Sequence, residues 1–114
     1  MNLENIYSGI KEKRLYGRYI ANSHIEYIIE EFKNVFEVEI VGASVLQKPV
    51  YSVKAGSGSV KIFIWSQMHG NESTTTKALF DFLNYLKSKT EYAQTLLDHF
   101  TFYILPILNP DGAA

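Results

Sequence analysis

The chain has 114 residues, of which 46% are hydrophobic and 20% are charged, as expected for one small globular domain. Lys and Arg number 11 against 12 Asp and Glu, a net charge of −1 that excludes a general nucleic-acid binder and gives no attraction to anionic membranes. The lack of cysteine excludes disulfides, cysteine-bound zinc and a thiol nucleophile.

The first third of the chain predicts two helices. Leu3, Ile6 and Ile10 are spaced as on one helical face, and the charged stretch 11–14 that follows is interpreted as a solvated helix end rather than a docking patch. Ser23 with Glu26 predicts a capping box for the second helix, with Asn22 as the alternative cap. The apolar face of this helix is formed by Ile25, Ile28, Ile29, Phe32 and Phe36.

Three strands are predicted next, over residues 36–40, 50–54 and 60–65. Gly42 is expected to close the first strand, and Pro49 stands at the start of the second. The Gly-Ser-Gly-Ser sequence at 56–59 indicates a hairpin turn, so the three strands are expected to be antiparallel neighbours. The third strand is apolar enough to be central in the sheet.

The rest of the chain predicts a long helix, a short helix at 90–98 and a strand at 100–105 that Pro106 and the turn at 109–112 terminate. The buried stripe of the long helix is expected to contain Ala78, Leu79, Phe82, Leu83 and Leu86. The unit from 60 to 105 should form a right-handed parallel crossover.

These elements predict an α/β fold with a mixed sheet and helices on both faces, formed by residues 1–114 as one domain. The apolar runs are too short to span a bilayer, and the N-terminal residues have no signal-peptide pattern. We therefore expect no membrane association, and the absence of a signal pattern and of cysteine favours a cytoplasmic location.

Two polar segments follow the two parallel strands. Residues 66–72 come after the third strand, and residues 107–112 come after the fourth. Because parallel strands end at the same edge of a sheet, where α/β folds bind ligands, the two segments should lie together.

His69 and Glu72 are the candidate metal ligands within the first segment. Imidazole nitrogen and carboxylate oxygen suit Zn²⁺, and Gly70 would relieve crowding where the strand turns toward the helix. A surface His and a Glu favoured by the helix dipole would give the same spacing, so this pattern alone leaves both interpretations open.

The other candidates are assigned structural roles. His24 and His99 are interpreted as structural or exposed. The hydroxyl groups of Ser66, Ser73 and 74–76 are not surrounded by a nucleophile-elbow motif and are interpreted as capping groups at a helix start.

Residues 65–72, WSQMHGNE, followed by residues 104–112, ILPILNPDG, resemble the zinc carboxypeptidases of the carboxypeptidase A type, the M14 metallopeptidases. The resemblance covers the chain from about residue 15 and corresponds to the N-terminal part of the catalytic domain. It implies a three-layer carboxypeptidase-like (phosphorylase/hydrolase-like) architecture, truncated here after the fourth strand.

The resemblance also implies a function: hydrolysis of C-terminal peptide bonds, with one Zn²⁺ held in part by His69 and Glu72. The family's third ligand, its general base and its substrate-binding arginines would lie beyond residue 114, so no catalytic residue is assigned within this chain. We therefore expect weak or no zinc binding and no activity from the chain alone.

Two other functions remain open. Acylase-like zinc hydrolases also contain a His-Gly-x-Glu segment, although Asn-Pro-Asp-Gly favours the peptidase branch. In a non-catalytic α/β binding module, His69 and Glu72 would only cap and pack. The expected partner is a peptide or peptide-like substrate with a free C-terminus, of undetermined side-chain preference. A sheet edge or face left open should also cause self-association of the chain.

Overall fold

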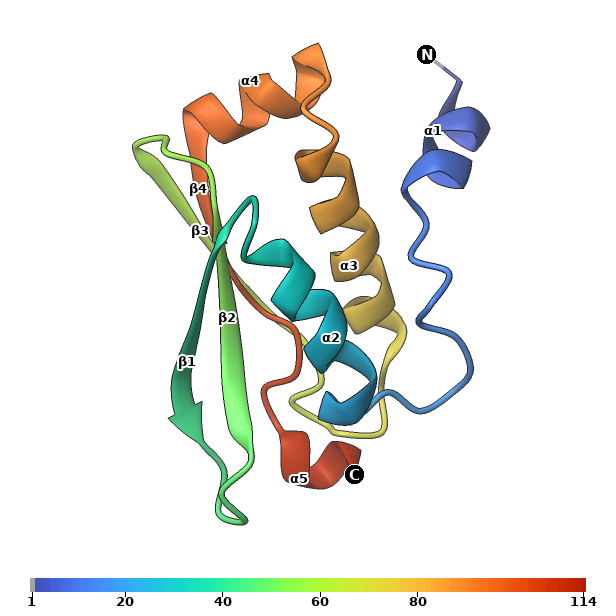
Figure 1. The fold of residues 1–114 in the computed structure, drawn as a ribbon, viewed down its shortest axis with the longest axis vertical. Coiled ribbons are helices and arrows are strands. Elements are labelled where there is room, and N and C mark those ends of the chain that lie inside the picture. Colours follow the sequence, from blue (N-terminus) through green and yellow to red (C-terminus); the bar gives the residue numbers. More distant parts are fainter. Residues whose placement is uncertain (1) are drawn as a thin grey trace.

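The computed structural model describes residues 2–114 (Figure 1). The elements in chain order are α1 (Leu3–Ile10), α2 (Asn22–Phe32), β1 (Glu37–Ala43), β2 (Pro49–Ala55), β3 (Val60–Trp65), α3 (Thr74–Lys87), α4 (Glu91–His99), β4 (Phe100–Leu105) and α5 (Pro110–Ala113). None of the helices described is long and apolar enough to cross a membrane. The predicted α/β class with a mixed sheet is confirmed.

The four strands are arranged in the order β1-β2-β4-β3. The predicted parallel pairing of β3 with β4 and antiparallel pairing of β1 with β2 are both present. The predicted hairpin between β2 and β3 is wrong, because β4 lies between them and pairs antiparallel with β2. Consequently β3 is an edge strand of the described sheet rather than a central one.

The segment 56–59 connects β2 with β3 by passing β4 instead of forming a hairpin turn, and its two glycines allow this path. A Cβ on Gly58 would lie 1.8 Å from the carbonyl carbon of His99, and Gly56 has a φ of +91°. The segment therefore passes directly over the junction between α4 and β4, an approach that only a residue without a side chain allows.

The hydrophobic core lies between the sheet and the helices α2 and α3, which run along the same face (Figure 1). Phe32 of α2 stacks on Phe80 of α3 with ring centroids 5.9 Å apart, and Val53 and Ile104 meet them from the sheet. Phe80 is fully buried although the predicted stripe omitted it, whereas Ala78 is exposed.

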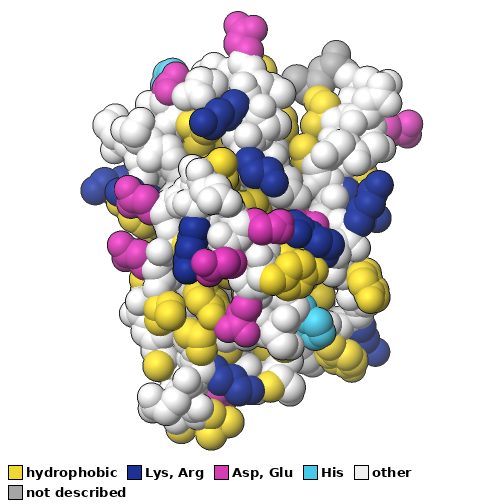
Figure 2. Space-filling model, in the orientation of Figure 1, with side chains coloured by type: hydrophobic (Ala, Val, Ile, Leu, Met, Phe, Trp, Pro, Cys, Tyr) yellow, Lys and Arg dark blue, Asp and Glu magenta, His cyan; other side chains and the backbone are white. Residues whose placement is uncertain are grey.

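The opposite face of the sheet carries no helix in residues 2–114, so helices cover one face where both were expected. Phe63 and Trp65 project from this open face with exposed fractions of 60% and 49%, and Phe63 also stacks on Tyr103. Hydrophobic side chains are also exposed on β1 and on the hairpin that follows it, at the lower left of Figure 2.

The start of α2 differs from the predicted capping box. Ala21 is the N-cap residue, and the His24 ring nitrogen Nδ1 accepts the Ala21 N–H at 2.9 Å. Asn22 is not the cap, because its amide donates to the Pro49 carbonyl on β2. The helix ends at Phe32, and Phe36 packs on the core just before β1.

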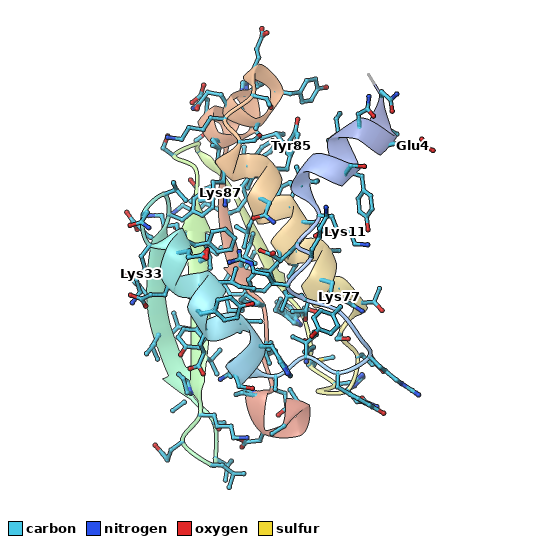
Figure 3. All side chains as sticks on the ribbon, turned by 45° about the vertical axis from the view of Figure 1, so that its right-hand side comes forward. Glu4, Lys11, Lys33, Lys77, Tyr85 and Lys87 are labelled. Atoms are coloured by element: carbon cyan, nitrogen blue, oxygen red, sulfur yellow. The ribbon has the colours of Figure 1, made fainter. Side chains whose placement is uncertain are left out.

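Residues 11–21 form an arm without helix or strand that runs along α3 and leads to the start of α2 (Figure 1). The expected solvated helix end is wrong here: Glu12 is buried, its N–H donates to Asp81 of α3, and its carboxylate pairs with Arg14. Burial alone would raise the pKa of the Glu12 carboxyl. The hydrogen bonds and the charge of Arg14 outweigh this effect and hold the pKa below its ordinary value. Lys77 reaches from α3 to the carbonyl of Gly17 at 2.8 Å (Figure 3).

Candidate metal centre

The two segments that follow β3 and β4 are joined by hydrogen bonds, as the sequence predicts. The Leu108 N–H donates to the Ser66 carbonyl at 2.9 Å, and the Asn109 N–H donates to the Gln67 carbonyl at 3.1 Å. The Asn109 side-chain amide donates to the carbonyl of Met68. The segment that carries His69 is thus an extension of the parallel pairing between β3 and β4.

Gly70 brings the two segments into backbone contact. A Cβ on Gly70 would lie 2.0 Å from the carbonyl carbon of Gly112 and 2.3 Å from the nitrogen of Ala113. Gly70 is therefore required by the approach of the second segment, and not by the turn of its own backbone as the sequence suggested.

His69 and Glu72 lie side by side at this edge of the sheet, with His69 Nδ1 3.4 Å from Glu72 Oε2. The Glu72 N–H donates to the His69 carbonyl in the turn that leads into α3. Both side chains are exposed, and they line an open hollow of about 440 Å³ together with Trp65, Met68 and Thr75.

This separation fits two ligands of one zinc ion. With bonds of about 2.0–2.2 Å, two donors at a tetrahedral angle are roughly 3.4 Å apart. Residues 2–114 contain no group of three His, Cys, Asp or Glu side chains close enough to hold a metal. The chain therefore supplies two donors of the right chemical type and spacing, and the ion's remaining ligands would have to come from elsewhere.

Asn109 and Asp111 of the second segment have structural partners that the sequence did not reveal. The Asn109 side-chain oxygen accepts the Gly112 N–H, which caps the one-turn helix α5 where a simple turn was expected. The Asp111 carboxylate accepts the Ser44 hydroxyl at 2.6 Å and the Leu46 N–H at 3.1 Å. Asp111 thereby ties the hairpin between β1 and β2 to the candidate centre.

The remaining candidates lie in structural contacts. His99 ends α4 with its Nδ1 3.0 Å from the Thr95 carbonyl, and His24 caps α2 as described above. The prediction that the hydroxyl groups cap α3 is wrong. The Ser73 hydroxyl donates to the Arg18 carbonyl, and the Thr76 hydroxyl is hydrogen-bonded to the Ser66 hydroxyl and to the Pro106 carbonyl inside the core.

Comparison with known proteins finds peptidases of similar sequence. The chain is 34% identical over 80 residues to gamma-D-glutamyl-L-diamino acid endopeptidase 1 of Lysinibacillus sphaericus, covering 63% of the chain and 20% of that protein. It is 26% identical over 96 residues to carboxypeptidase B of Astacus astacus, covering 82% of the chain and 32% of that protein.

Among solved structures, bovine thrombin-activatable fibrinolysis inhibitor in complex with tick carboxypeptidase inhibitor superposes with a TM-score of 0.70 at 25% identity. That match covers 83% of the chain and 32% of the solved chain. The chain thus spans between a fifth and a third of the length of these three proteins. The model of the family described as "Peptidase_M14: Zinc carboxypeptidase" matches residues 21–114, and the chain belongs to this family.

Proposed function

We propose that the polypeptide carrying this chain is a zinc metallocarboxypeptidase in which His69 and Glu72 are two of the metal ligands. The 3.4 Å separation between His69 Nδ1 and Glu72 Oε2 carries the proposal, because it matches the distance between two donor atoms of a tetrahedral zinc site. A bound zinc ion would act as a Lewis acid on the scissile carbonyl and lower the pKa of its water.

The residues around this pair support it in three ways. Gly70 lets the two segments meet, Asn109 holds the first segment by its Met68 carbonyl, and the turn into α3 places Glu72 beside His69. The open hollow in front of the pair leaves space for a peptide end. The match to the zinc carboxypeptidase family favours this function over the acylase branch and over a non-catalytic module.

We further propose that residues 1–114 alone do not hydrolyse peptides. Two donors hold zinc weakly, because the missing ligand removes both affinity and tetrahedral geometry.

The test compares hydrolysis of a peptide that has a free C-terminal carboxylate with hydrolysis of the same peptide amidated at that end, using the whole polypeptide. We expect release of the terminal residue from the free peptide only, loss of activity with a chelator, and recovery with Zn²⁺. His69→Ala and Glu72→Gln should each lower kcat/KM by at least about a thousandfold, since each removes a metal ligand. His99→Ala is the matched control, because His99 lies at the end of α4. Chelator-insensitive cleavage, or full activity of His69→Ala, would overturn the proposal.

A further inference from the structure

Gln67 occupies an unusual position two residues before His69. Its side chain is 3% exposed, and its backbone has a φ of +50°, in the left-handed region that non-glycine residues seldom adopt. Such a conformation persists only where the surroundings hold it in place. Here the Gln67 carbonyl accepts the Asn109 N–H and thereby joins the two segments of the candidate centre.

The Gln67 amide connects two parts of the chain that are far apart in sequence. Its Nε2 donates to the carbonyl of Ile20 on the arm and to the carbonyl of Gly70, both at 2.8 Å. Since both partners are carbonyl oxygens, only the NH₂ group can satisfy them, which fixes the orientation of the amide. One side chain thus holds the segment on both sides of His69 and anchors it to the arm.

The side-chain oxygen of Gln67 indicates that this residue does more than stabilise the core. Oε1 of Gln67 is buried and has no hydrogen-bond partner among the described residues. An unpaired buried acceptor is unfavourable, and an apolar residue would avoid it. The two bonds from Nε2 are therefore the contribution that a glutamine makes at this position.

The arm is fixed next to the same segment by a second bond. The Ser73 hydroxyl, immediately after Glu72, donates to the Arg18 carbonyl at 2.6 Å. The two bonds to the arm thus bracket the pair formed by His69 and Glu72. Arg18 and Ile20 precede residue 21, where the match to the family begins.

We infer that Gln67 is a positioning residue for the metal centre, which holds His69 and Glu72 at ligand spacing by anchoring their segment to the N-terminal arm. This inference rests on the proposed function, in which the two side chains are metal ligands. The contacts of Gln67 are backbone carbonyls and not the ligands themselves, so its effect on the metal is indirect.

The test uses Gln67→Met, which keeps the size of the side chain and removes the amide. Asn84→Leu is the matched control, because the Asn84 amide, near the C-terminal end of α3, makes the same kind of bond to a backbone carbonyl far from His69, that of Ile10 at the end of α1, at 2.9 Å. Zn²⁺ is titrated into the metal-free whole polypeptide and followed by the NMR signals of the His69 ring. Gln67→Met should raise the zinc Kd about tenfold, the usual effect of losing a residue that supports a ligand, and Asn84→Leu should leave it within about twofold.

A second readout needs no metal. Amide hydrogen exchange at Asn109 and Glu72 should become about tenfold faster in metal-free Gln67→Met, because both N–H groups donate to carbonyls of the anchored segment. Unchanged exchange and an unchanged Kd would overturn the positioning role. If Gln67→Met does not fold, Ser73→Ala provides the same two measurements on the second bond to the arm. If the His69 signals of the whole polypeptide do not respond to zinc, the proposed function is contradicted, while the exchange rates still decide the role of Gln67.

Discussion

Gly70 and Gly112 lie in direct backbone contact, so closely that a Cβ on Gly70 would stand 2.0 Å from the carbonyl carbon of Gly112. The two glycines belong to different segments, one after β3 and the other within α5. The contact explains why a glycine follows His69, because a side chain at position 70 would push the second segment away from this edge of the sheet. A Cβ on Gly112 would instead meet the Asn109 side chain, with its Nδ2 at 2.6 Å, within the second segment.

Gly70→Ala should therefore be strongly destabilising. The new methyl group would meet backbone atoms that cannot rotate away, so we expect a loss of about 1–3 kcal/mol in the free energy of unfolding, the usual cost of overpacking. Gly42→Ala is the matched control, because a Cβ there has nothing within 4 Å. Urea unfolding measures both, and equal stability of the two variants would contradict the contact.

The ion pair of Glu12 with Arg14 predicts a dependence of stability on pH. The folded pKa of Glu12 lies below its ordinary value of 4.5, so its contribution is present above that pH and is lost as the pH falls through the folded pKa. Glu12→Gln should be less stable than the unmodified chain at pH 7, and the difference should shrink as the pH falls below about 4.5. Urea midpoints measured from pH 7 to pH 3 test this, and a constant difference would show that Glu12 does not act through its charge.

The open face of the sheet predicts that the isolated chain self-associates. Phe63 and Trp65 form an edge-to-face pair with centroids 5.9 Å apart on an edge strand whose outer hydrogen-bonding groups have no partner strand among residues 2–114. We expect a concentration-dependent rise in sedimentation coefficient, reduced by Phe63→Ser. Tyr92→Ser removes an aromatic ring of similar exposure from α4 and should change nothing. Sedimentation as a monomer at high concentration would contradict the prediction.

The sequence predicted the local elements well because their signals are local. Apolar residues at helical spacing marked α2, alternation marked β1 and β2, and the turn residues after Leu105 marked the end of β4. The convergence of the two polar segments could also be predicted, since it follows from the parallel pairing of β3 with β4.

The errors arose where distant residues decide the structure. Nothing near 56–59 reveals that β4, some 40 residues later, inserts between β2 and β3 and replaces the expected hairpin. The N-cap residue of α2 is Ala21 and the acceptor of its N–H is the His24 ring, and neither residue type is a usual choice at these positions. The roles of Gln67 and Glu12 depend on the arm, whose path along α3 leaves no periodic signal in the sequence.

The most direct measurement is the zinc content of the purified whole polypeptide after dialysis against metal-free buffer. If His69 and Glu72 are ligands, the unmodified protein should retain about one zinc per chain, His69→Ala and Glu72→Gln should retain less than about a tenth, and His99→Ala should match the unmodified protein. Zinc retained in full by the folded His69→Ala variant, or absent from the unmodified protein under conditions where zinc is supplied, would contradict the metal centre described above.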